Sequence, residues 1–342
     1  MEHEDQLSRL KAQSQDNPLS RRDFMRVLSV ATTAGTGLMT AAFTGMNLTS
    51  TQRAEAAEAL VDGMGKMPKV QFGTRLGKMK VTPVTMCQDW NPELFGPALA
   101  LGCNFIHKAG YWKGNVPSEI AKLPRESYYT DITVDSTPEN PDDYDNAYNQ
   151  VISSLNANGL KYYDVFRAHY GWKSVNVFKT QTGTYRAFQR LKKEGKVKYF
   201  GVSQHPFIPY PEMIQAEIDS GLIDAMQVQV TYGMKKEDME IFAKASKAGI
   251  AMTAMKICAY GMGTMRKDNA RQDQLKASGL PGRALLRDVL TAKRPDGKPI
   301  FQTCVTALGN VQHFDENMGS VATKTAMLDG FGEYHSLIQH EA

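Results

Sequence analysis

Short apolar runs alternate with longer amphipathic segments along residues 57–342. Eight runs rich in β-branched or aromatic residues predict strands: Val81–Met86, Phe105–His107, Tyr128–Val134, Tyr163–Ala168, Lys198–Ser203, Ala225–Val230, Ala251–Met255 and Cys304–Ala307. Apolar residues at helical spacing predict helices between them, among them Tyr144–Ala157, Tyr185–Glu194, Pro211–Ser220, Lys236–Lys247, Arg283–Ala292 and Val311–Ser320. Glycine lies at or just past the last turn of several helices, as C-caps prefer.

Strict alternation of strands and helices predicts an α/β protein with parallel strands joined by right-handed crossovers. Eight such units close most naturally into a single (β/α)8 barrel, also called a TIM barrel, and residues 57–342 are slightly more than one usually needs. An open doubly wound sheet is the alternative, but no GxGxxG follows the first strand. The segment Val70–Val81 before the barrel is typical of a small hairpin that plugs the barrel floor.

The first 56 residues differ from the rest of the chain. Arg21 and Arg22 are followed, one place on, by an apolar pair, and no charged residue occurs in Val27–Gln52. That stretch contains too much Thr, Ser and Gly for a membrane span, and Ala54–Ala56 offers a small-x-small cleavage site. Residues 1–56 resemble a twin-arginine (Tat) signal peptide, and an uncleaved anchor or a cytoplasmic tail are the alternatives.

The resemblance to this signal divides the chain into a signal peptide, residues 1–56, and a barrel, residues 57–342. It also implies that the Tat export machinery is a partner and that the protein is located in the periplasm or another exported position. Because that route carries folded proteins, it also implies that any cofactor is loaded in the cytoplasm.

Composition narrows the function without naming it. Hydrophobic residues make up 42% and charged residues 22%, as in ordinary globular proteins. The 40 Lys+Arg and 36 Asp+Glu nearly balance and form no basic cluster, so no nucleic-acid binding is predicted. The four cysteines, at positions 87, 103, 258 and 304, have no CxxC spacing, so no metal site can be read from spacing alone.

Several short motifs occur in order along the mature chain: Arg75-Leu76-Gly77, Gly102-Cys103-Asn104-Phe105, Ser154-Leu155, Tyr163-Asp164 with His169, Gly195-Lys196-Val197 with Gly201-Val202-Ser203, and Asp315-Glu316-Asn317. Together they resemble the aldo/keto reductase superfamily over essentially the whole mature chain. The resemblance implies a (β/α)8 barrel that moves a hydride between a nicotinamide dinucleotide and the carbonyl of a small-molecule substrate.

The resemblance also implies a catalytic tetrad of Asp, Tyr, Lys and His, which is degenerate in this chain. A Tyr hydroxyl, with an ordinary pKa of about 10, gives up its proton more easily beside a Lys cation held by Asp. His169 occupies the family's His position, but the family's Asp falls on His107. The family's Lys falls on Thr133 or its neighbours Ile132 and Val134, none of which is basic. Tyr111 lies one residue short of the strict Tyr position, Trp112. The expected catalytic residues are therefore His169, Tyr111 as proton donor and His107 as a replacement partner.

The expected cofactor residues are carried over in the same way. Ser203 and Gln204 resemble the Ser-Asn pair that holds the nicotinamide carboxamide, and Gln227 resembles the Gln that assists it. Gln229 lies two residues further on the same strand face and replaces Gln227 if the register slips. Asn317 occupies the usual adenine-contacting position.

The choice between NADP and NAD stays open, because Gly309 occupies the place of a frequent Arg. The favoured function is an exported, nicotinamide-dependent oxidoreductase with an altered acid/base set. One alternative is a metal site, because thiolate and imidazole ligands for zinc or copper could meet at the barrel mouth from Cys87, His107, His169 and His205. The other is an inactive ligand-binding barrel in the periplasm. Substrate and oligomeric state are not predicted.

Overall fold

The computed structural model describes residues 66–87, 90–107, 122–134, 143–169, 182–205, 209–230, 234–257 and 282–306, with positions 20, 49, 51, 52, 55, 61, 120, 314, 317 and 318. Residues 1–56, the expected signal, therefore lie outside the described part of the chain except at isolated positions. Among the described residues, no helix combines the length and apolar character needed to span a membrane.

Eight parallel strands close into a barrel in the order β10-β3-β4-β5-β6-β7-β8-β9. They are β3 (Val84–Cys87), β4 (Phe105–His107), β5 (Tyr129–Val134), β6 (Tyr163–Ala168), β7 (Val197–Gln204), β8 (Ala225–Gln229), β9 (Ala251–Met255) and β10 (Thr303–Val305). The last strand, β10, pairs with both β9 and β3 and so closes the ring. The predicted (β/α)8 barrel is confirmed, and the open sheet is excluded.

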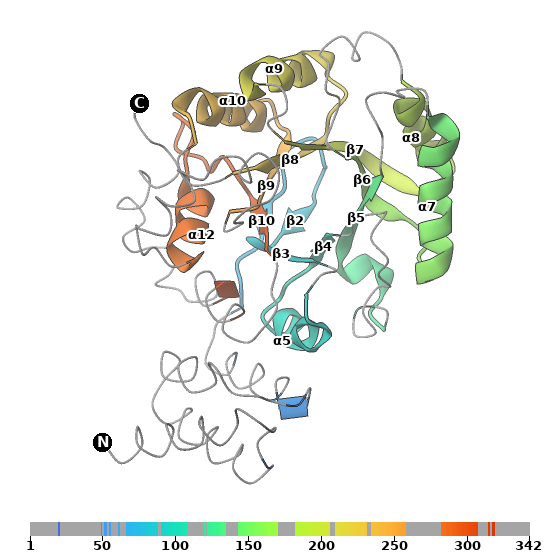
Figure 1. Cartoon of the computed structure of the whole chain (residues 1–342), viewed down its shortest axis with the longest axis vertical. Coiled ribbons are helices and arrows are strands. Elements are labelled where there is room, and N and C mark those ends of the chain that lie inside the picture. Colours follow the sequence, from blue (N-terminus) through green and yellow to red (C-terminus); the bar gives the residue numbers. More distant parts are fainter. Residues whose placement is uncertain are drawn as a thin grey trace.

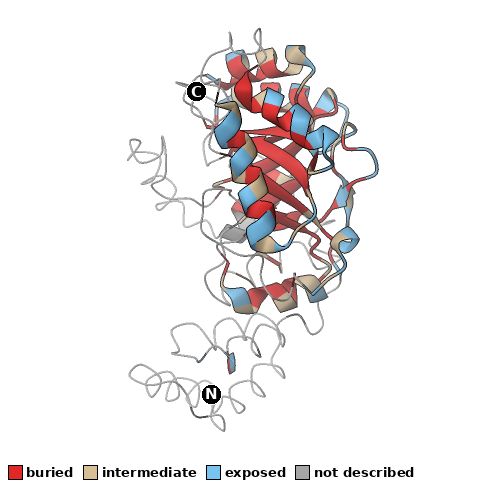
Figure 2. Cartoon of the chain, turned by 90° about the vertical axis from the view of Figure 1, so that its right-hand side faces the viewer, coloured by how far each residue is buried: buried red, intermediate tan, exposed pale blue. Residues whose placement is uncertain are grey.

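Helices surround this ring of strands (Figure 1). They are α5 (Phe95–Ala100), α7 (Tyr144–Asn158), α8 (Gly183–Lys193), α9 (Tyr210–Ser220), α10 (Lys236–Lys247) and α12 (Gly282–Thr291), with the 3-10 helices η1 (Pro92–Leu94) and η2 (Arg125–Ser127). In α8, the Thr182 side chain caps the first turn by accepting from the Tyr185 amide. The helices bury one face against the strands and expose the other, as amphipathic spacing requires (Figure 2).

The first predicted strand is divided in the structure. Val81 belongs to a separate hairpin, in which β2 (Lys80–Val81) pairs antiparallel with β1 (Val70–Gln71). The barrel strand begins only at Val84, because Pro83 has no amide hydrogen to continue a ladder. The short helix α5 was not predicted, since its sequence contains Gly and Pro and spans fewer than two turns.

The hairpin plugs the floor of the barrel, as expected. Its apolar side chains pack on the lowest inward-facing residues of the strands in one buried cluster: Phe72, Leu76, Met79, Val81, Phe105, Val165, Ala225 and Ala251. The Phe72 and Phe105 rings meet edge to face at 5.4 Å. Arg75 donates to the Ala248 and Ile223 carbonyls at 3.1 and 2.8 Å. With the floor filled by apolar side chains, polar chemistry is left to the opposite end, the carboxyl ends of the strands.

Candidate active site

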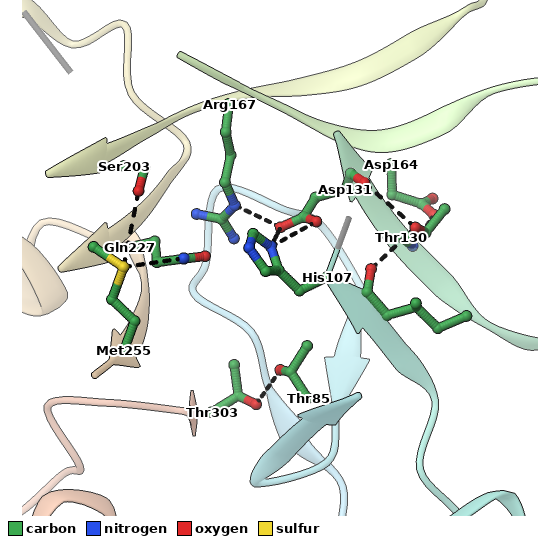
Figure 3. Close-up of polar contacts among 11 residues, drawn as sticks. Thr85, His107, Thr130, Asp131, Asp164, Arg167, Ser203, Gln227, Met255 and Thr303 are labelled. Atoms are coloured by element: carbon green, nitrogen blue, oxygen red, sulfur yellow. Dashed lines mark hydrogen bonds and ion pairs between the residues drawn. The ribbon is translucent and has the colours of Figure 1, made fainter. Parts of the chain in front are cut away.

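Three neighbouring strands place a buried ion network inside the barrel (Figure 3). His107, at the end of β4, lies with Nδ1 3.0 Å from both carboxylate oxygens of Asp131 on β5. Arg167 on β6 donates from Nε to Asp131 Oδ2 at 2.6 Å. These residues face inward because side chains alternate along each strand. Arg167 is the register partner of Thr133, and Asp131 lies two residues before Thr133 on the same face of β5.

Asp131 is ionised despite its burial. Burial by itself raises the pKa of Asp131, but the charges and hydrogen bonds of His107 and Arg167 outweigh it and hold that pKa below its ordinary value. The side chains of Arg167 and Asp131 are 0% and 1% exposed, whereas that of His107 is 10% exposed. The imidazole is therefore the member of the network that reaches toward the barrel mouth.

A second polar group lies at the mouth itself. His169, which follows β6, and His205, which follows β7, meet edge to face with ring centroids 6.2 Å apart. Gln229 Oε1 lies 3.2 Å and Lys256 Nζ 3.5 Å from His205 Nδ1. Burial first, and then the Lys256 charge, lower the pKa of His205 to about 3, so this imidazole is neutral at physiological pH.

Lys256 adopts a backbone conformation that favours glycine, with φ of 59°. A side chain in the left-handed region costs roughly 1–2 kcal/mol, and such strain is concentrated at functional sites. The strained residue directly follows β9 (Ala251–Met255) and brings its ammonium group to His205. The mouth thus carries a cation that the carried-over tetrad did not include.

The expected carboxamide site contains a buried amide oxygen, on Gln227, that accepts no hydrogen bond from the described residues. Gln227 Nε2 donates to Met255 Sδ at 3.2 Å, and Ser203 Oγ lies 4.0 Å from the same sulfur. Gln227 Oε1 is buried and has no hydrogen-bond partner among the described residues. An orphaned amide oxygen beside a hydroxyl fits the amide group of a nicotinamide, which presents both a donor and an acceptor.

The side chain of Gln204 lies outside the expected carboxamide site. It follows Ser203 on β7 and therefore faces the other side of the strand, where its Nε2 donates to Glu217 Oε1 on α9. This orientation differs from the expectation that Gln204 reaches the mouth beside Ser203. Asn317, the expected adenine contact, is a half-buried helical residue.

The structure brings His107 and His169 to the same end of the barrel, while Tyr111 lies outside the described residues. Within the described part of the chain, no three His, Cys, Asp or Glu side chains form a group that could hold a metal. Sequence reasoning missed Asp131 and Arg167. Their signal was a charged residue inside each of two buried strands, since buried charges are almost always paired.

The Gln204–Glu217 contact leads to a prediction for stability. Burial raises the pKa of Glu217 from 4.5 to about 8, and the Gln204 hydrogen bond offsets this only in part. The folded protein then holds a proton that the unfolded chain has lost, so stability falls as pH rises between these values, by an amount on the order of 5 kcal/mol. We expect Glu217→Gln to remove this decline, measured as urea unfolding at several pH values. Identical pH dependences for the two proteins would contradict the assignment.

The comparisons with known proteins agree with the fold and give the family. The model of the aldo/keto reductase family matches residues 93–320, and the chain belongs to that family. An aldo-keto reductase from Bacillus halodurans, solved in a holo form, is 17% identical with a TM-score of 0.58, over 81% of this chain and 98% of that chain. One from Brucella melitensis is 18% identical with a TM-score of 0.53, over 79% and 98%.

No curated protein sequence matches the chain. At these identities the solved structures support the fold, whereas family membership supports oxidoreductase chemistry and a family preference for NADP(H).

Proposed function

We propose that the protein is an exported, nicotinamide-dependent oxidoreductase that interconverts a carbonyl and an alcohol on a small molecule, using an altered acid/base set. The observation that carries this proposal is the His107–Asp131–Arg167 network. The carboxylate of Asp131 on β5 and the cation of Arg167 on β6 lie together in the barrel interior. The resemblance places the family's Asp and Lys elsewhere, at the positions of His107 and Thr133.

The network prepares His107 to move a proton. Asp131 accepts from Nδ1–H, which fixes the tautomer and leaves Nε2 as the second proton-carrying position of the ring. An ionised Asp131 also stabilises the imidazolium form, and Arg167 holds that carboxylate in place. We assign His107 as the partner of Tyr111, which donates the proton, and His169 as the residue that orients the carbonyl oxygen.

The cofactor is NADP or NAD, and when bound it supplies the hydride for the carbonyl carbon. Ser203 and Gln227 hold its carboxamide, and the orphaned Gln227 Oε1 is the acceptor for the amide N–H. Asn317 contacts the adenine. Gln204 has no part in this site, because its side chain is bound to Glu217.

Cofactor binding tests this proposal directly. Titrating NADPH and NADH into the full-length protein, followed by cofactor fluorescence, is expected to show saturable binding well below millimolar concentration. Gln227→Met removes the amide and is expected to weaken binding about tenfold, as for one buried hydrogen bond. Gln150→Met, at a surface glutamine of the outer helix α7, is the matched control and leaves the affinity nearly unchanged. Absence of binding at millimolar concentration would rule out the cofactor-dependent function.

Export is tested separately. Supporting it are the arginine pair, the uncharged stretch and the small residues before Ala57. We expect the protein to accumulate outside the cytoplasm of a bacterium that has the Tat machinery, with its mature start near Ala57. Changing Arg21 and Arg22 together to lysine is expected to retain it in the cytoplasm, as followed by cell fractionation. Equal export of both proteins would contradict the signal assignment.

A further inference from the structure

The barrel interior contains buried polar atoms that the described residues leave without hydrogen-bond partners. They are Arg167 Nη1 and Nη2, Thr133 Oγ1, Gln227 Oε1 and Thr253 Oγ1. They form two neighbouring pairs, because Thr133 is the register partner of Arg167 and Gln227 is the register partner of Thr253. The Gln227 pair belongs to the proposed carboxamide site, and the Arg167 pair is still without a ligand.

Of these residues, Arg167 has the most hydrogen-bond donors left unpaired. Only its Nε is engaged, by Asp131, and the four N–H groups of its two terminal nitrogens are buried with no acceptor among the described residues. Each buried donor left unpaired costs roughly 1–3 kcal/mol. In Figure 3 the guanidinium of Arg167 lies between the side chains of Gln227 and His107.

We propose that Arg167 and Thr133 bind a substrate carboxylate, so that the protein acts on 2-oxo acids and 2-hydroxy acids; this inference rests on the proposed function. A planar guanidinium presents two parallel N–H groups that match the two oxygens of a carboxylate. The Thr133 hydroxyl, beside Arg167 in the register, supplies a further donor. A carbonyl bonded directly to that carboxylate then lies between His107 and the carboxamide site at Gln227.

The charges around the site support this class of substrate. Asp131 engages only Nε of Arg167, so the guanidinium can bind a second carboxylate through its terminal nitrogens while it keeps its contact with Asp131.

The reaction balances with the proposed cofactor alone. In reduction, the reduced nicotinamide transfers a hydride to C2 of the oxo acid, and the oxygen on C2 takes a proton from the acid/base set. The products are the 2-hydroxy acid and the oxidised nicotinamide. The carboxylate stays on Arg167 throughout and takes no part in bond formation.

Binding of a matched pair of unreactive compounds tests the inference. Oxamate has a carboxylate next to a carbonyl, and methyl oxamate has the same carbonyl with a neutral ester. Calorimetry on the full-length protein, with and without NADPH, is expected to show oxamate binding at least about tenfold more tightly, since hydrogen bonds to a charged group contribute about 1.5–3 kcal/mol.

Variants assign the effect to these residues. Arg167→Lys keeps a cation for Asp131 but loses the two-pronged fork, and is expected to weaken oxamate binding by about tenfold or more. Arg190→Lys, at an exposed Arg of α8, is the matched control. Thr133→Val serves if Arg167→Lys does not fold, because its hydroxyl bonds to no described residue; it is expected to weaken oxamate binding severalfold. The inference is overturned if oxamate and methyl oxamate bind with equal affinity. It is also overturned if neither Arg167→Lys nor Thr133→Val weakens oxamate binding.

Turnover separates this inference from the proposed function. Pyruvate and methyl pyruvate are assayed with NADPH and NADH, and pyruvate is expected to have the higher kcat/KM. If methyl pyruvate is reduced as well as pyruvate, the carboxylate site is overturned and the oxidoreductase function stands. If oxamate binds but neither cofactor does, the proposed function fails and the anion site stands.

Discussion

Replacing His107 with glutamine is expected to lower kcat for carbonyl reduction by a factor of about 100 to 10,000, the usual contribution of a positioned acid or base. The glutamine amide can still donate to Asp131 and nearly fills the space, but it cannot take up or release a proton. The residues of the proposed carboxamide site, Ser203 and Gln227, lie on β7 and β8 and are unaffected. Steady-state kinetics and a parallel titration of the cofactor measure the two effects independently.

His205→Gln is the matched control for this variant. The imidazole of His205 also lies at the mouth, but burial and Lys256 lower its pKa to about 3, so at neutral pH the imidazolium form that would act as an acid is absent. We expect its replacement to change kcat by less than about fivefold. A His107→Gln protein that keeps more than a tenth of its activity, or a His205→Gln protein that loses as much, would contradict the assignment of His107.

The fold was predictable wherever burial dictates the sequence pattern. Parallel strands buried on both faces read as continuous apolar runs, and β4, β6 and β9 have the predicted bounds. Helix α10 also has its predicted bounds, because its exposed face is densely charged. The division at Pro83 was not predicted, since the apolar run continues through the break and only the hairpin pairing with Val70 shows where the first ladder ends.

The site was predictable only in part, for a different reason. Alternation along a strand places His107 and His169 near the mouth without knowledge of their neighbours. The Asp131–Arg167 pair depends on two strands whose contact is set by barrel register, which a single sequence does not state. A charge inside an apolar strand reports that a partner exists, as at Asp131 and Arg167, but the partner's identity comes from the coordinates.

The same limit applies to Gln204 and Lys256. A match to a family motif gives Gln204 a position in the chain, whereas strand alternation turns its side chain toward Glu217 on α9. Lys256 lies where alternation alone points its side chain away from the interior, and its left-handed backbone brings the ammonium group back to His205. Backbone strain of this kind has no signature in the sequence, because lysine is not a residue that favours it.

The largest effect on stability is expected from Gly73→Ala in the floor hairpin. Gly73 has φ of 62°, and a Cβ there would lie 2.7 Å from the Ala251 amide nitrogen and 2.8 Å from the Gly249 carbonyl oxygen. Both are backbone atoms, so the hairpin must move away from the barrel. The conformation costs roughly 1–2 kcal/mol and the overlap about 1–3 kcal/mol more. A loss of about 2–5 kcal/mol is a large share of a typical stability of about 5–15 kcal/mol.

Gly159→Ala separates the two contributions. Gly159 has the same φ of 62° at the end of α7, but nothing lies within 4 Å of a Cβ built there. The Gly159→Ala variant should therefore lose only the conformational part of the free energy of unfolding, roughly 1–2 kcal/mol. Urea unfolding of the two variants and the wild type measures this difference. Equal losses in both variants would mean that the hairpin yields without cost and that the floor is not held by close backbone contact. A larger loss for Gly73→Ala ties the closed floor, and with it the placement of chemistry at the opposite end, to that contact.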